Sequence, residues 1–192
     1  MKSICVYLGS MRNLHGDYIE AARELGRELA RRKIRLVYGA GNVGLMGELA
    51  NSVLENGGEV IGVIPRSMVE REWAHMNLSK LHVVETMHER KALMAEMADA
   101  FIAMPGGLGT LEEIAECLTW IQLGYLHKPA AFWNVRRYYD LFAGFITQME
   151  REGFIRDSDR DFIFMHEKLG SVFDYLGANC LPQSAGDNLS KS

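Results

Sequence analysis

Apolar residues along the chain gather in short uninterrupted runs, and longer stretches with a helical period separate most of these runs. The runs have the length and composition of buried strands, and they cover residues 4–8, 36–38, 59–64, 81–84, 100–104 and 130–133. The i, i+3, i+4, i+7 pattern predicts helices over residues 17–32, 44–56, 87–98, 110–124, 138–152 and 167–176. Continuous apolar strands that alternate with helices are typical of an α/β fold, in which helices cover both faces of a parallel sheet.

The pattern predicts a single domain over residues 1–178, because the 192-residue chain shows neither an internal repeat nor a long linker. Residues 65–80 have no clear period, and we expect a loop with some helix there. Residues 179–192 are mostly small and polar, so the sequence predicts a disordered tail.

Charge and cysteine content narrow the function classes. A net charge of −4 gives no reason to expect a nucleic-acid polymer as partner. The chain enters its first apolar strand without a charged leader, so we expect neither a signal peptide nor a membrane span. Cys5, Cys117 and Cys180 are odd in number and far apart, which fits a reducing cytoplasm. Without C-x-x-C or H-E-x-x-H spacing, we expect no metal site.

Ligands of open parallel sheets lie beyond the carboxyl ends of the strands, so the strand-to-helix turns are the places to look for chemistry. Three turns are informative: YLGS (7–10), YGAGNVGLMG (38–47) and MPGGLGTLEE (104–113). The second contains Gly39, Gly41 and Gly44 as a G-x-G-x-x-G pattern. The next strand ends in VIPRS, without the acid that would hold a ribose, which favours packing or phosphate binding over NAD.

The third turn places three glycines between a buried strand and a helix. Such a turn brings backbone N–H groups close to a ligand, and the amides of the following helix attract anions. The sequence predicts Thr110 as the N-cap of that helix, with a hydroxyl that can also face the anion. No lysine follows the glycines, so one phosphate group is expected rather than a nucleoside triphosphate.

Glu113 has two interpretations from its spacing. Thr110 and Glu113 have the spacing of a capping box, and the spacing by itself favours this structural role. A carboxylate beside a phosphate site would also lie where the sugar of a nucleotide is held. The sequence leaves both roles open.

Arg90 interrupts an apolar stripe that is formed by Met87, Met94 and Met97 on one face of the predicted helix 87–98. Arginine is almost never buried without a partner. Either its stem extends to solvent, or its guanidinium holds a charged or polar group at a cleft. Lys91 is expected to point in a different direction.

Taken together, these motifs resemble the LOG (Lonely Guy) family of cytokinin riboside 5′-monophosphate phosphoribohydrolases, formerly described as lysine decarboxylases. The family pattern P-G-G-x-G-T-x-x-E matches residues 105–113, and M-H-x-R-K matches residues 87–91. Further segments resemble the family from residue 7 to residue 154. The resemblance implies a Rossmann-like fold, a homodimer, and cleavage of adenine-type nucleoside 5′-monophosphates to free base and ribose 5-phosphate, with no cofactor or metal.

The resemblance also implies roles for individual residues. Arg90 and Glu113 correspond to the catalytic pair. The substrate-binding residues are expected to be Glu72, Lys91, Gly106, Gly107, Leu108, Gly109, Thr110 and Thr119, together with Gly9, Ser10, Gly41, Gly44 and Met46 from the first two turns. The chain departs from the common family pattern at Ala40, where a glycine is usual, and at Leu8, where a cysteine is usual.

Two other functions remain open from the sequence. Molybdenum cofactor carrier proteins share a related fold and bind a phosphorylated pterin without chemistry, although the Arg90 and Glu113 pair argues against that function. An NAD-type oxidoreductase is disfavoured by the missing acid. The sequence does not separate AMP from its N6-prenylated form as substrate.

The residue pattern of helix 110–124 also predicts a homodimer, because the helix is apolar on two sides. Its two apolar sides are Leu111, Ile114, Leu118 and Ile121 on one, and Cys117 and Trp120 on the other. We expect one side to cover the sheet and the other to meet a partner helix in a twofold dimer. The alternative is that residues 154–176 cover it within the same chain.

Overall fold

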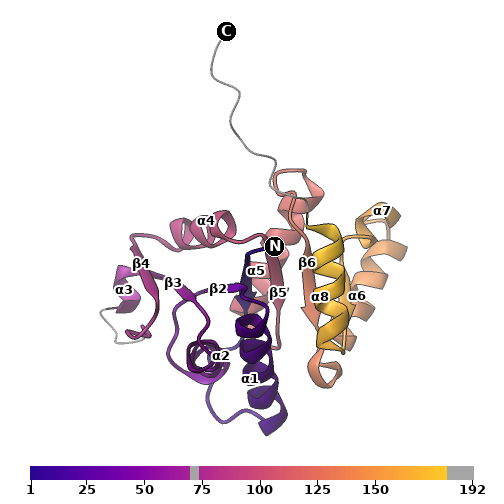
Figure 1. Cartoon of the computed structure of the whole chain (residues 1–192). Helices are drawn as coiled ribbons and strands as arrows, with labels where there is room; N and C mark the ends of the chain where they lie inside the picture. Colours follow the sequence, from indigo (N-terminus) through magenta and orange to yellow (C-terminus); the bar gives the residue numbers. More distant parts are fainter. Residues whose placement is uncertain (70–73, 181–192) are drawn as a thin grey trace.

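The computed structural model describes residues 1–69 and 74–180, and its centre is one parallel sheet of seven strands (Figure 1). The strands are β1 (Ser3–Tyr7), β2 (Arg35–Tyr38), β3 (Val60–Pro65), β4 (Lys80–Val84), β5 (Ala100–Ala103), β6 (Ala130–Trp133) and β7 (Phe164–His166). Their order is β4-β3-β2-β1-β5-β6-β7. The predicted parallel sheet is confirmed, and six of its strands follow the apolar runs. The hydrophobic pattern missed β7, which has only three residues at the sheet edge.

The predicted helices are confirmed as well, with ends that lie within three residues of the expected ones. They are α1 (Gly16–Arg31), α2 (Gly44–Glu55), α4 (Met87–Met97), α5 (Leu108–Gln122), α6 (Asp140–Arg151) and α8 (Leu169–Asn179). Short helical segments add α3 (Arg66–Val69), η1 (Val135–Arg137) and α7 (Asp157–Arg160). None of the helices within the described ranges has the length and apolarity that a membrane crossing requires.

The expected loop with some helix over residues 65–80 contains α3. Ala74 forms an isolated bridge with Gly41, and the His75 N–H donates to the Ala40 carbonyl at 2.8 Å, so this segment lies against the second glycine turn. Glu72 falls outside the described residues. Of the predicted tail, residue 179 is instead the last residue of α8, and residues 181–192 fall outside the described residues.

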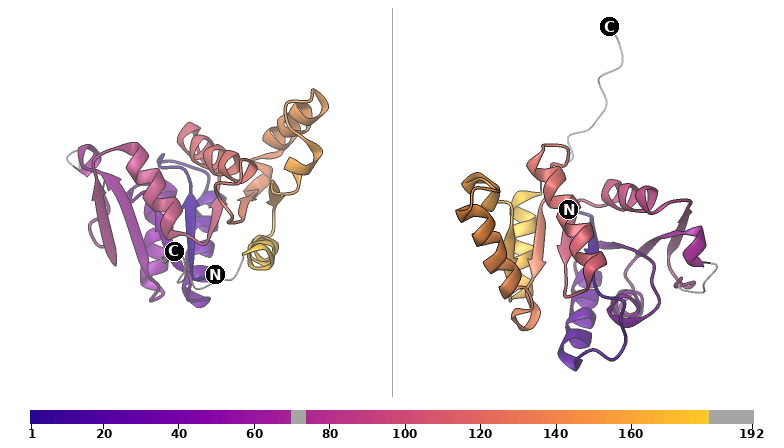
Figure 2. Two further views of the ribbon diagram at one scale, coloured as in Figure 1. Left: turned by 90° about the horizontal axis from the view of Figure 1, so that it is seen from above. Right: turned by 180° about the vertical axis from the view of Figure 1, so that it is seen from behind.

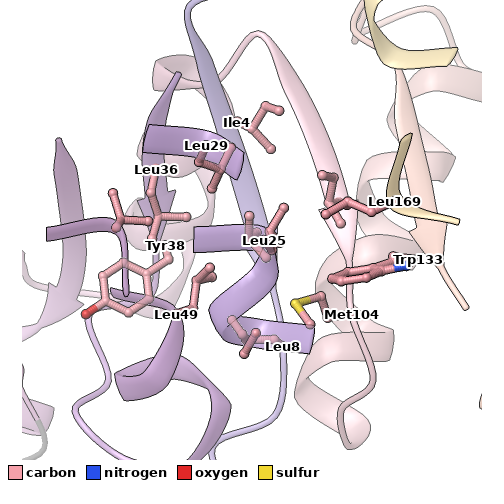
Figure 3. Close-up of a cluster of buried hydrophobic side chains, with 14 of the residues drawn as sticks. Ile4, Leu8, Leu25, Leu29, Leu36, Tyr38, Leu49, Met104, Trp133 and Leu169 are labelled. Carbon is pink, nitrogen blue, oxygen red and sulfur yellow. The ribbon is translucent and has the colours of Figure 1, made fainter. Parts of the chain in front are cut away.

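Helices cover both faces of the sheet and bury a separate apolar cluster on each. On one face, α1, α2 and α8 enclose a cluster that contains Ile4, Leu25, Leu29, Leu49 and Leu169 (Figure 3). On the other face, α4 and α5 bury residues such as Met94, Ile114 and Cys117 against the sheet. Helix α1 is in front of the sheet in Figure 1, and α5 comes to the front in the view from behind (Figure 2). Each fully buried leucine contributes about 2 kcal/mol through the hydrophobic effect.

The strand order reverses between β1 and β5, which makes the carboxyl ends of these two strands the expected ligand crevice. The turn after β1 and the turn after β5 touch there, since the Gly9 N–H donates to the Pro105 carbonyl at 3.1 Å. The turn after β2 adjoins them on the β1 side of the reversal.

Candidate active site

A cavity of about 530 Å³ opens at this reversal of strand order. All three glycine-containing turns contribute to it, together with the end of β3, α3 and α4. Its lining residues are Val6, Leu8, Gly9, Ser10, Met11, Gly39, Gly41, Val43, Met46, Ile64, Met68, Arg90, Gly107, Leu108, Gly109, Thr110 and Glu113. The lining is largely apolar, and Arg90 and Glu113 are its charged residues among those described. Such a site holds a small organic ligand by its apolar part and orients it by a few polar groups.

Arg90 and Glu113 form an ion pair inside this cavity, with 3.3 Å between Arg90 Nη2 and Glu113 Oε1. The guanidinium also donates from Nε to the Val63 carbonyl at 3.2 Å, and Nη1 lies 3.1 Å from Met87 Sδ. Arg90 is 9% exposed, so its side chain does not extend to solvent. The apolar stripe of α4 therefore carries a buried arginine that holds a carboxylate.

Burial raises the pKa of the Glu113 carboxyl above its usual value of 4.5, and the positive charge of Arg90 partly opposes that shift. A carboxyl group of raised pKa is a stronger base than an exposed glutamate once it is ionised. A perturbed carboxyl in a cleft beside a fixed cation is typical of a catalytic site.

Helix α5 begins two residues earlier than the sequence predicts, which overturns the capping-box interpretation of Glu113. Its N-cap is Gly107, in an extended conformation (φ −90°, ψ −156°) and without a side-chain capping bond. Thr110 is the third helical residue and Glu113 the sixth, so Glu113 is too far along the helix to reach the N-cap. The prediction failed because glycine, with no side chain, ends the turn and caps the helix itself.

The second glycine turn is shaped by contacts that leave no room for side chains. A Cβ at Gly39 would lie 1.8 Å from Arg90 Nη2. Gly44 has φ of +60°, and a Cβ there would lie 2.4 Å from the Met11 carbonyl oxygen. This turn therefore accommodates the Arg90 guanidinium and packs against the turn after β1. This packing is enough to explain the glycines at both positions.

Comparisons with known proteins identify the family. The family model described as "Possible lysine decarboxylase" matches residues 46–176. The cytokinin riboside 5′-monophosphate phosphoribohydrolase LOG of Oryza sativa subsp. japonica is 49% identical over 162 residues, which cover 84% of this chain and 67% of the relative. The phosphoribohydrolase of the same activity from Rhodococcoides fascians is 48% identical over 165 residues, or 85% of this chain and 83% of the relative. The chain belongs to the LOG family.

Solved structures of other proteins share the fold of this chain. The molybdenum cofactor binding protein of the phototrophic bacterium Rippkaea orientalis superposes with a TM-score of 0.69, covering 93% of this chain and 97% of that one. The molybdenum cofactor carrier protein of Chlamydomonas reinhardtii gives 0.67, covering 92% and 96%. At 18% and 20% identity, these likenesses show a shared Rossmann-like fold and nothing further.

Many of the residues that the LOG signature implies meet in the cavity. The Arg90 and Glu113 ion pair is there, with Gly107, Leu108, Gly109 and Thr110 from the third turn. Gly9, Ser10, Gly41 and Met46 line it from the other two turns. Gly44 and Gly106 support the lining from behind, Gly44 against Met11 and Gly106 against Gly9 and Thr110.

Lys91 and Thr119 are not among the lining residues of this LOG-family cavity. The Lys91 ammonium donates to Glu112 at 2.5 Å and to Glu116 at 3.0 Å, which fits the expectation that it points away from Arg90. The Glu112 hydrogen bond is the main cause of its raised pKa. Thr119 is exposed on α5 and donates to the Ala115 carbonyl at 2.8 Å. The substrate-binding roles of both residues remain predictions.

The sequence missed the apolar half of the lining, which includes Met11, Val43, Ile64 and Met68. Only the strand order brings these residues together, because they lie at or after the carboxyl ends of three different strands. The departure at Ala40 is visible in the backbone, where this buried residue has φ of +58°. A glycine would adopt that conformation without strain.

Nowhere in residues 1–69 and 74–180 do three or more His, Cys, Asp or Glu side chains form a group that could hold a metal ion.

Proposed function

We propose that the protein hydrolyses the N-glycosidic bond of adenine-type nucleoside 5′-monophosphates and releases free base and ribose 5-phosphate. The observation that carries this proposal is the buried Arg90 and Glu113 pair, which faces a cavity lined by all three glycine-containing turns. The names of the LOG-family relatives support the same activity. The proposal requires neither a cofactor nor a metal.

Glu113 supplies the charge that this reaction needs. Breaking an N-glycosidic bond develops positive charge on the sugar, and a fixed carboxylate beside the sugar stabilises it. The same carboxylate can orient a water molecule or accept its proton, and its raised pKa strengthens it as a base. Arg90 holds Glu113 in place through the 3.3 Å ion pair, and a guanidinium does not readily give up a proton.

The third turn provides the proposed phosphate site. Helix geometry leaves the first N–H groups of α5 without partners along the helix, and the N-terminal end of the helix favours an anion. Gly107, Leu108 and Gly109 line the cavity at this end. A phosphate held there by several backbone donors would place the attached ribose between the turn and Glu113, which is the sixth residue of the same helix.

The proposal predicts that the 5′-phosphate is required for efficient turnover. We expect kcat/KM for adenosine to be about a hundredfold lower than for AMP, because adenosine forgoes the charge-assisted hydrogen bonds to the turn. The assay measures base and ribose 5-phosphate release from a panel of AMP, N6-prenylated AMP, other nucleoside monophosphates and adenosine.

The panel also decides between the open alternatives. The ratio of AMP to N6-prenylated AMP turnover gives the preferred substrate. Equal cleavage of adenosine and AMP would show that the phosphate assignment is wrong. Tight nucleotide or pterin phosphate binding without any base release would instead favour a carrier of the molybdenum-cofactor type.

The proposal includes a homodimer. Other residues of the same chain cover part of α5. Phe162 and Ile163 pack against the apolar cluster that α5 contributes to, and Gln122 donates to Asp159 at 2.8 Å. The turn that follows α5 still exposes Leu123 (61%) and Tyr125 (80%), which supports a contact with a second copy.

Light scattering at micromolar protein concentration checks this assembly, and we expect twice the mass of one chain. A strictly monomeric mass would contradict it.

We also propose a cytoplasmic location, which rests on the odd number and wide spacing of the three cysteines.

A further inference from the structure

The third glycine turn is held by its carbonyl groups. From residue 104 to residue 107, every carbonyl accepts a hydrogen bond from the protein. Two of the donors are backbone amides: Gly9 N–H donates to Pro105 at 3.1 Å, and Leu111 N–H donates to Gly107 at 3.1 Å. The peptide planes of the turn are therefore fixed from the protein side.

The other two donors are consecutive tyrosines from the segment after β6. The Tyr139 hydroxyl donates to the Met104 carbonyl, and the Tyr138 hydroxyl donates to the Gly106 carbonyl, both at 2.6 Å. Tyr139 is buried, whereas Tyr138 is 45% exposed. The two tyrosines thus hold the turn by hydrogen bonds to the carbonyls on either side of Pro105.

Holding the Gly106 carbonyl has a direct consequence for the next amide. A trans peptide is planar, and its C=O and N–H groups point in opposite directions. The hydrogen bond from Tyr138 to Gly106 therefore directs the N–H of Gly107 away from Tyr138. Gly107 lines the cavity, and its N–H has no hydrogen bond within the described part of the chain. That amide is free to bind a ligand.

The turn cannot supply this rigidity from its own sequence. A Cβ at Gly106 would lie 2.1 Å from Thr110 Oγ1, so the packing of the turn requires glycine at this position. Glycine has the widest backbone freedom of all residues, so it does not hold a peptide plane by itself. The orientation has to be imposed by a neighbour, and the Tyr138 hydroxyl makes that contact.

The segment that carries the tyrosines is itself strained and firmly held. Arg136 and Arg137 have φ of 55° and 59°, a conformation that costs of order 1 kcal/mol for each non-glycine residue. Arg136 forms an ion pair with Asp17, and Arg137 Nε donates to Asp140 at 2.7 Å. Strain of this kind persists only where the surroundings over-determine the backbone, and it is concentrated at functional sites.

Further contacts fix the ring that reaches the turn. The Asn134 side chain accepts from the Tyr139 N–H at 2.7 Å and donates to Asp140 at 2.8 Å. The Tyr138 ring meets Tyr18 edge-on at 6.1 Å. These contacts hold the Tyr138 hydroxyl against a flexible glycine peptide.

We propose that Tyr138 is a positioning residue for anion binding, which acts through the Gly106 carbonyl to direct the Gly107 N–H at a phosphate group in the cavity. The identity of that group as the 5′-phosphate of a nucleotide rests on the proposed function. The role does not require that Tyr138 touch the substrate.

The test removes one hydroxyl and follows two readouts. We expect Tyr138→Phe to weaken ribose 5-phosphate binding, measured by calorimetry, about tenfold, and to lower kcat/KM for AMP by a similar factor, as expected for one misdirected hydrogen bond. Turnover of adenosine should change less than twofold, because adenosine has no phosphate to hold. The melting temperature should stay within a few degrees of wild type, since a half-exposed hydroxyl is replaced by water at the Gly106 carbonyl.

Tyr175→Phe is the matched control. This tyrosine lies on α8, its ring stacks on Phe164 at 4.1 Å, and its hydroxyl makes no hydrogen bond within the described residues. Its loss should leave ribose 5-phosphate binding and AMP turnover unchanged.

The outcomes separate this inference from the proposed function. Unchanged ribose 5-phosphate binding by Tyr138→Phe would overturn the inference, as would an equal fall in AMP and adenosine turnover with a lower melting temperature. If the wild type released no base from any nucleotide and Tyr138→Phe still weakened ribose 5-phosphate binding, the positioning role would stand and the hydrolase proposal would fall. If the wild type released base from AMP but had no measurable affinity for ribose 5-phosphate, the inference would fall and the hydrolase proposal would stand.

Discussion

Replacing Glu113 by Gln should lower kcat/KM for AMP on the order of a thousandfold, while the protein melts within a few degrees of wild type. Gln has nearly the same shape and keeps an oxygen at the position that lies 3.3 Å from Arg90 Nη2 in the wild type. It lacks the negative charge that faces the developing positive charge of the sugar. Removal of a positioned base or charge typically costs a factor of 10² to 10⁴. Base release and thermal melting, measured on the same preparation, check both parts.

The pH profile gives a second readout for Glu113. Turnover requires the ionised carboxylate, so kcat/KM falls as the pH drops through the pKa of Glu113. Because burial raises that pKa, the acid limb should lie above pH 4.5, the usual value for glutamate. The residual activity of Glu113→Gln should lack this limb.

Glu112→Gln is the matched control, one residue earlier on the same helix. Glu112 is exposed and accepts a hydrogen bond from Lys91. When Glu112 is changed, Lys91 can still donate to the carboxylate of Glu116. Its direction differs from that of Glu113 by about 100° around the helix. We therefore expect near wild-type turnover. Equal losses in the two variants would mean that neither carboxylate has the specific role assigned to Glu113.

The sequence was sufficient for the framework and for singling out Arg90, for physical reasons that are visible in single residues, whereas its pairing with Glu113 was implied by the family resemblance. Buried strands such as β1 and β5 are continuous apolar runs, so periodicity located them. Arg90 stood out because an arginine in an apolar stripe needs a partner. The direction of its partner Glu113 depends on where α5 begins. Local spacing misplaced that start because Gly107 caps the helix without a side chain.

Other features of the site depend on contacts between distant segments. Tyr138 reaches Gly106 across 32 residues of chain because β6 lies beside β5 in the sheet. Lys91 lies next to Arg90 in sequence, yet its ammonium is held by two carboxylates of α5 on a different side of α4. No local pattern encodes either contact, so both had to come from the structure.

Replacing Gly39 by Ala should lower kcat/KM for AMP by more than about a hundredfold, although Gly39 carries no chemistry. The new Cβ would lie 1.8 Å from Arg90 Nη2 and 2.8 Å from Cζ, so the guanidinium must move away. Arg90 is buried and held by the Val63 carbonyl, so it has little space in which to re-form its ion pair with Glu113. A displacement of about 1 Å in a catalytic constellation can cost a factor of 10².

A second buried glycine separates this effect from a general loss of stability. Gly26 lies where α1 packs on α2, and a Cβ there would lie 2.6 Å from the Ser52 Cβ. Gly26→Ala should lower the urea midpoint of unfolding, but the protein that remains folded should keep its kcat, because no residue of the cavity moves. Gly39→Ala should lose turnover even at temperatures where it is fully folded. If the two variants instead lost stability and activity in the same proportion, Gly39 would matter only for packing, and the placement of Arg90 would not depend on the space that this glycine leaves.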